Sequence, residues 1–200
     1  MKRAVYFTAD WHLGHNNIIK FDNRPFHDIQ EMEKSIIKRF NAVVPKYGIT
    51  YILGDVGKID NLSNVLNSLN GTKILVRGNH DKKMQGMMNA GFDVVIDTAS
   101  IQISKQIVTM SHCPLLGVFR EDVSGFKKSL PTDNWFKEHQ YKEYSLPDFG
   151  QFHLHGHTHL YKGKGLVRDG RQWDVGVVGN NYMPVSFGQI ESWIKSIVGK

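Results

Sequence analysis

The 200-residue sequence contains one cysteine and no long apolar run. Because Cys113 has no partner in the chain, an internal disulfide framework and the zinc patterns that need four cysteines are excluded. A metal ion would have to be held by His, Asp, Glu or Asn side chains. The start MKRAVYFTADWHLGH reaches Asp10 after only a short apolar stretch, so it is unlike a signal peptide or a membrane span. We therefore expect a cytoplasmic protein with no membrane partner.

The sequence also lacks internal repeats, low-complexity tracts and any linker rich in Pro, Gly or Ser. With 40% hydrophobic and 22% charged residues, the composition is that of an ordinary globular domain, and we expect one domain over residues 1–200. The net charge of +6 favours anionic partners. This charge agrees with a phosphate-bearing small molecule or nucleotide, and also with nucleic acid.

Three apolar runs predict buried strands, at 4–10, 50–56 and 73–79. Between them, the segments 28–44 and 59–71 repeat apolar residues every three or four positions, which predicts helices. Strands that alternate with helices predict an α/β fold with a largely parallel sheet.

Later segments at 93–112, 151–157 and 171–179 read as further strands, and 187–198 as a closing amphipathic helix. We therefore predict a two-layer, β-sandwich-like sheet core flanked by helices.

The segment 117–147 fits neither the helical nor the strand period. Its five basic residues are balanced by five acidic ones, so a nucleic-acid groove is not its expected role. We interpret it as an insertion or lid, in which Trp135 or Phe136 would be able to stack on a substrate base.

Residues that can bind metals or move protons follow most of the predicted strands, at the place where ligands bind in open α/β sheets. Each has a structural explanation when taken alone, since aspartate caps turns, asparagine adopts left-handed turns and histidine packs in cores. The residues are Asp10, His12, Asp55, Asn79, His80, His112, His157 and His159.

Five short motifs contain these residues in a fixed order: DWH at 10–12, GD at 54–55, GNHD at 78–81, His112, and GHTH at 156–159. Together they resemble the calcineurin-like metallophosphoesterase superfamily, whose pattern is D-x-H, G-D, G-N-H-[DE], H and G-H-x-H. The opening block, with its later NRPF, also resembles a bacterial and phage subgroup of that superfamily. The resemblance spans nearly the whole chain and implies an α-β-β-α metallophosphoesterase fold.

The resemblance implies a centre of two divalent metal ions, with Mn as the expected metal and Fe, Ni, Zn or Mg as alternatives. A water or hydroxide between the ions would attack phosphorus, and His80 would protonate the leaving group. Asp55 would bridge the ions. One ion would be completed by Asp10, His12 and His159, and the other by Asn79, His112 and His157.

Four further residues are candidates for substrate binding, and each also has a structural reading. Arg77 fits either a substrate phosphate or an ion pair, His15 and Arg24 follow the first ligands, and Lys162 lies in a basic run that also fits a solvated hairpin. Asp81 is expected either to orient His80 or to cap the following helix.

The run GDVGKID departs from the G-D-x-x-D-R-G of the phosphoprotein phosphatases, which argues against serine/threonine phosphatase activity. We therefore expect a metal-dependent phosphodiesterase that acts on a nucleotide-like substrate. The alternatives are a phosphomonoesterase, a nuclease or a non-catalytic scaffold that binds other proteins.

Overall fold

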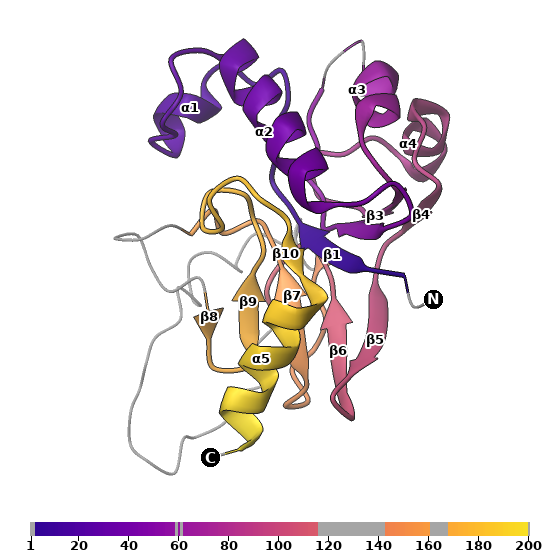
Figure 1. Cartoon of the computed structure of the whole chain (residues 1–200), viewed down its shortest axis with the longest axis vertical. Coiled ribbons are helices and arrows are strands. Elements are labelled where there is room, and N and C mark those ends of the chain that lie inside the picture. The colour runs from indigo at the N-terminus through magenta and orange to yellow at the C-terminus, as the bar shows by residue number, and fades with distance from the viewer. Residues whose placement is uncertain (1–2, 59, 61, 116–142, 161–167, 200) are drawn as a thin grey trace.

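The computed structural model describes residues 3–58, 60, 62–115, 143–160 and 168–199. Two five-stranded sheets form the centre of the molecule, with helices around them (Figure 1). The prediction of an α/β protein with two sheets flanked by helices is therefore confirmed. Most of the predicted insertion at 117–147 lies outside the described residues.

The first sheet has the order β10-β1-β2-β3-β4. Its first four strands in the chain are parallel, as the alternation of strands and helices predicts, and β10 pairs with β1 in the antiparallel direction. The strands are β1 (Val5–Thr8), β2 (Ile49–Ile52), β3 (Thr72–Val76), β4 (Val94–Ile96) and β10 (Val185–Ser186).

The second sheet is mixed and has the order β5-β6-β7-β9-β8. β6, β7 and β9 are parallel neighbours, whereas β5 and β8 are antiparallel to the strands they adjoin. The strands are β5 (Ala99–Ile103), β6 (Gln106–Met110), β7 (Phe152–His155), β8 (Arg168–Asp169) and β9 (Gln172–Asp174).

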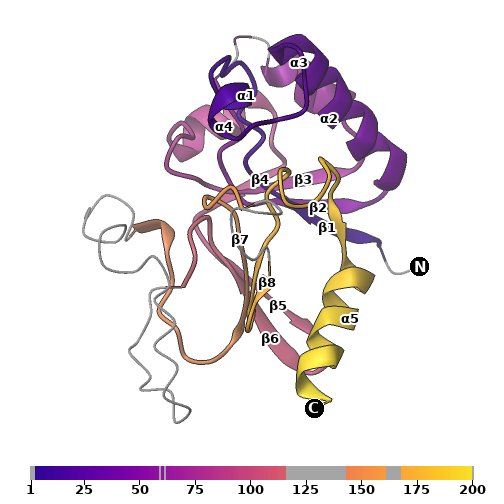
Figure 2. The ribbon, with the colours of Figure 1, turned by 90° about the vertical axis from the view of Figure 1, so that its left-hand side faces the viewer.

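Helices cover the outer face of the first sheet, and Figure 2 shows α2, α3 and α4 together on the side away from the second sheet. Asp28 begins α2 by accepting the backbone N–H of Glu31, and Ser186 begins α5 in a capping box with Gln189. The helices are α1 (Ile18–Phe21), α2 (Ile29–Val43), α3 (Leu62–Ser68), α4 (Met84–Ala90) and α5 (Phe187–Val198). The sequence predicted α2, α3 and α5, but not the short α1 and α4.

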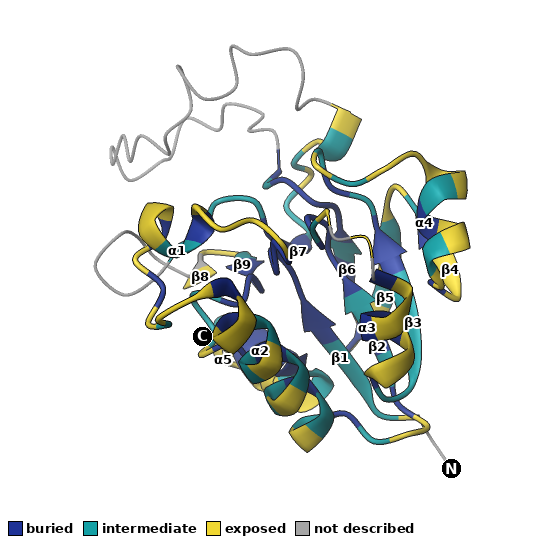
Figure 3. Ribbon diagram, turned by 90° about the horizontal axis from the view of Figure 1, so that it is seen from above, coloured by how far each residue is buried: buried dark blue, intermediate teal, exposed yellow. Residues whose placement is uncertain are grey.

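Two hydrophobic clusters fill the spaces between the layers. One lies between the first sheet and helices α1 to α4, and includes Phe40, Leu66 and Met87. The other joins both sheets and α5, where the ring of Trp193 meets Phe152 edge to face. Figure 3 shows the buried residues along the strands and the exposed outer faces of α2 and α4. Within the described part of the chain, no helix is long and apolar enough to cross a membrane.

The two sheets are also joined at their ligand-bearing ends. Ala9, at the end of β1, forms an isolated parallel bridge with Gly176, just after β9. The backbone N–H of Val177 donates to the carbonyl oxygen of Ala9 at 3.0 Å. Residues that follow strands of either sheet therefore lie close enough to build one site.

Candidate metal centre

The seven predicted ligand residues come together where the two sheets meet. The residues after β1, β2 and β3 share one edge because these strands are parallel, and the residues after β6 and β7 reach the same place from the second sheet. They form two adjoining groups, of which the first is Asp10, His12, Asp55 and His159 and the second is Asn79, His112 and His157.

The first group is compact around two histidine rings. The Nε2 atoms of His12 and His159 lie 3.1 Å apart. Asp55 Oδ2 lies 3.6 Å from His12 Nε2, and Asp10 Oδ1 lies 3.8 Å from His159 Nε2. Two nitrogen and two carboxylate donors thus face a common point.

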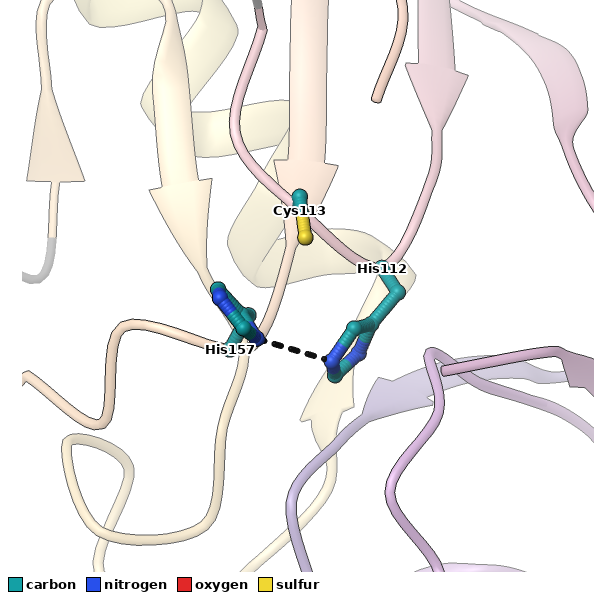
Figure 4. A group of neighbouring side chains, drawn as sticks. All are labelled: His112, Cys113 and His157. Carbon is teal, nitrogen blue, oxygen red and sulfur yellow. Dashed lines mark hydrogen bonds between the residues drawn. The ribbon is translucent and has the colours of Figure 1, made fainter. Parts of the chain in front are cut away.

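The second group is arranged around His112. Its Nε2 lies 2.9 Å from Asn79 Oδ1 and 3.2 Å from His157 Nδ1. Figure 4 shows the rings of His112 and His157 turned toward each other. Cys113 lies beside them, but burial raises the pKa of its thiol to about 12. Because metals bind the thiolate form, Asn79 is the better third donor of this group.

Asp55 connects the two groups. Its Oδ2 faces His12, whereas its Oδ1 lies 3.5 Å from His112 Nε2. Burial opposes the charge on both partners, yet their attraction prevails: it lowers the pKa of Asp55 and raises the pKa of His112 to about 9. This geometry agrees with the bridging position expected for Asp55.

The pKa values of the remaining candidate ligands are shifted in different directions. Burial opposes the charge on His159, but Asp10 and Asp22 outweigh burial and raise its pKa. Burial raises the pKa of Asp10 to about 7 and lowers the pKa values of His12 and His157 to about 3. Neutral imidazole is the form that binds metals. A bound cation would place a positive charge beside the buried carboxylates and so favour their ionised form. A mixed set of nitrogen and oxygen donors suits Mn, Fe, Zn or Ni better than Ca. These groups of donors could therefore hold a metal ion.

The backbone at the centre is unusual. Half of the ten described non-glycine residues with positive φ are predicted ligands. Left-handed backbone at such residues is disfavoured and gathers at functional sites, where the surrounding structure holds it in place. The five are Asp10 (φ 59°), His12 (52°), Asp55 (53°), His157 (68°) and His159 (48°).

Two glycines allow the close packing of these turns. A Cβ atom at Gly78 would lie 2.3 Å from Asp55 Oδ1, and one at Gly156 would lie 2.6 Å from Asp10 Oδ2. Both distances are far below van der Waals contact. The glycines of GNHD and GHTH are therefore required by the approach of a carboxylate.

His80 lies beside the centre with an exposed side chain. Its backbone N–H donates to Asp55 Oδ1 at 3.0 Å, and its ring lies 5.8 Å from that of His12. The neighbouring Asp81 accepts the N–H groups of Asp55, Val56 and Gly78 at 2.8–3.0 Å. Asp81 thus holds the turns around Asp55. It does not cap α4, because the N-cap position of that helix is Lys83.

The four candidates for substrate binding differ in where the structure places them. The prediction for Arg24 is wrong, because its guanidinium is buried and bound to Asp22 and to the carbonyl oxygens of Asp10 and Trp11. Arg77 pairs with Asp97 at 2.5 Å, which agrees with its structural reading. His15 is exposed, and its ring lies 5.9 Å from that of His12. Lys162 lies outside the described residues.

Sequence reasoning missed two buried carboxylates near the centre. Asp22 Oδ2 lies 2.8 Å from His159 Nδ1. Asp174 accepts the Thr158 hydroxyl and the backbone N–H of Gly176, and so supports the GHTH turn. Asp174 was detectable as a charged residue directly before the apolar run at 175–178, whereas Asp22 stands in a polar loop where nothing in the pattern marks it.

The comparisons with known proteins concern the fold more than the activity. No protein-family model matches the sequence. An uncharacterised protein of Methanocaldococcus jannaschii is 44% identical over 84 residues, which are 40% of this chain and 48% of that protein. The match therefore spans about half of that relative's length.

Longer matches are weaker in identity. The Gene 66 proteins of Mycobacterium phages L5 and D29 are 25% and 26% identical, over 78% and 86% of this chain and 77% and 87% of the phage proteins. The crystal structure of a protein of unknown function from Aquifex aeolicus aligns with a TM-score of 0.71 at 24% identity, over 96% of this chain and 100% of that one. This last likeness shows a shared fold.

Proposed function

We propose that the chain is a two-metal phosphoester hydrolase with a metallophosphoesterase fold, and that it acts on phosphodiesters of nucleotide size. The observation that carries the proposal is the position of Asp55. Its two oxygens face separate donor groups, at 3.6 Å from His12 and 3.5 Å from His112. A carboxylate placed between two groups of metal-binding donors fits the two-ion sites that hydrolyse phosphoesters.

Different residues of the chain would hold the metal ions and protonate the leaving group. Asp10, His12 and His159 would hold one ion, Asn79, His112 and His157 the other, and Asp55 both. When bound, two such ions neutralise charge on the phosphoryl oxygens and lower the pKa of an attacking water. His80 is fixed through its backbone to Asp55, while its exposed ring can meet the leaving oxygen and protonate it.

A substrate with a planar group is supported by two exposed rings beside the centre. Phe21 is 68% exposed, and its ring lies 5.9 Å from that of His15, which in turn lies 5.9 Å from that of His12. An aromatic wall at this place would stack on a base whose phosphate is at the ions. A polynucleotide substrate has only the net charge of +6 in its favour.

The test is hydrolysis of a chromogenic phosphodiester and a matched phosphomonoester by chelator-stripped protein, with Mn, Ni, Zn or Mg added back. Metal-dependent cleavage that favours the diester is expected. Preference for the monoester would make the protein a small phosphatase. Two bound ions without any cleavage would favour a protein-binding scaffold.

A further inference from the structure

A buried ion pair lies directly behind one of the candidate ligands. Asp22 follows α1 and is 3% exposed, and its carboxylate faces His159 Nδ1 at 2.8 Å. The same carboxylate accepts two N–H groups of Arg24, from Nε at 3.0 Å and from Nη2 at 2.8 Å. Arg24 is itself 4% exposed.

Two further hydrogen bonds of Arg24 reach the first ligand segment. Its Nη1 donates to the carbonyl oxygen of Trp11 and its Nη2 to that of Asp10, each at 3.0 Å. These two carbonyls belong to the turn that presents Asp10 and His12. The pair thus connects the turn after β1, in the first sheet, with the turn after β7, in the second.

Stability alone does not account for this arrangement. Removing two charges from water costs about as much as their attraction returns, so a buried ion pair is weak evidence for a stabilising role. What it does fix is the state of His159, because an ionised carboxylate can only accept hydrogen bonds. Nδ1 of His159 therefore carries a proton, and Nε2, on the side of His12, is left as the atom that can bind an ion.

We propose that Asp22 and Arg24 are positioning residues for the metal ion held by Asp10, His12 and His159. Asp22 fixes the tautomer and orientation of His159, and Arg24 fixes Asp22 together with the turn that presents Asp10 and His12. A carboxylate behind a histidine ligand also makes that ligand more basic. The inference rests on the two-ion site of the proposed function.

At the other metal position, the group behind His112 is neutral. His112 Nδ1 lies 2.7 Å from the carbonyl oxygen of Leu53, a neutral acceptor. The two positions therefore differ in the group behind a histidine ligand. A change at Asp22 should weaken one of them and leave the other as it was.

The experiment is a calorimetric titration of the chelator-stripped chain with Mn²⁺. Wild-type protein should bind two ions. Asp22→Asn should keep one site unchanged and weaken the other by about 10- to 100-fold, the usual effect of losing such an outer partner. Arg24→Lys, which cannot span Asp22 and both carbonyls, should weaken the same site.

Asp93→Asn is the matched control, because Asp93 also pairs with a basic side chain, Lys73, but touches no ligand residue. It should bind both ions as the wild type does. If Asp22→Asn fails to fold, nitrogen NMR of histidine-labelled, Zn²⁺-loaded wild-type protein gives a second readout. His159 should bind the ion through Nε2 and carry its proton on Nδ1.

Equal affinity at both sites in Asp22→Asn, binding of Zn²⁺ through Nδ1 of His159, or no ion bound by the wild type would each overturn the inference. The diester assay separates it from the proposed function. Cleavage with unchanged Mn²⁺ binding in Asp22→Asn would refute the inference and keep the function. Selective loss of one ion in Asp22→Asn, with no cleavage by the wild type, would support the inference and refute the proposed function.

Discussion

His153 should make the metal-free protein sensitive to acid. This β7 side chain is fully buried, with Nδ1 at 2.9 Å from the Thr109 hydroxyl and Nε2 at 3.1 Å from the carbonyl oxygen of Cys113. Burial, and then the neighbouring His155, lower the pKa of His153 from 6.5 to about 3. The folded state therefore resists a proton that the unfolded chain accepts.

The sign and size of the effect follow from linkage. As the pH falls below 6.5, the unfolded state binds the proton first, so folding stability is lost until the pH reaches about 3. A full proton corresponds to about 1.4 kcal/mol per pH unit. Between pH 6 and pH 4, His153 should thus remove about 2–3 kcal/mol from the free energy of unfolding.

Urea unfolding of chelator-stripped protein across this range tests the argument. His153→Gln removes the titrating ring and keeps a polar side chain. The free energy of unfolding of this variant should fall less steeply between pH 6 and pH 4 than that of the wild type. The difference in unfolding free energy between wild type and variant should therefore shrink by about 2–3 kcal/mol. The exposed His27→Gln controls for the loss of one histidine. Parallel curves for wild type and His153→Gln would refute the reasoning.

Three further changes probe the centre itself. His80→Ala should keep both metal ions but slow cleavage of a substrate with a poor leaving group by at least about a hundredfold, and unchanged turnover would remove His80 from the mechanism. Asp55→Asn should reduce metal occupancy, measured by elemental analysis after dialysis, so two retained ions would contradict the bridging role. Gly156→Ala should also reduce occupancy, because its Cβ would meet Asp10 Oδ2 at 2.6 Å and the side chain of Ala9 at the same distance; full occupancy would show that the turn can relax.

The parallel order of β1, β2 and β3 was readable from the sequence because its signals are local, whereas β10 was not predicted and β4 was not assigned to this sheet. Apolar runs and helical spacing occur within one segment at a time, and parallel order follows from their alternation. The second sheet was readable only as a set of strands. Its order depends on contacts between distant segments, such as β6 beside β7, that no local period records.

The candidate ligand residues could be picked out because each follows a strand and fits a motif, whereas the residues that support them could not. Arg24 was interpreted as a substrate contact, since a guanidinium in a loop looks the same whether it faces solvent or a buried carboxylate. The burial of Arg24 depends on Asp22, on the carbonyls of the first turn and on the thioether sulfur of Met32. This sulfur lies 3.4 Å from Nη1 of Arg24. Only the folded chain brings these groups together.

The left-handed turns limit how the metal preference of this centre can be redesigned. Five positions with φ between 48° and 68° accept Asp, Asn, His or Gly far more readily than β-branched or bulky residues. A library that exchanges donors there should stay within those four amino acids. Asn79 and His112 have no such backbone restriction, but His112 is fully buried, so changes of size belong at Asn79.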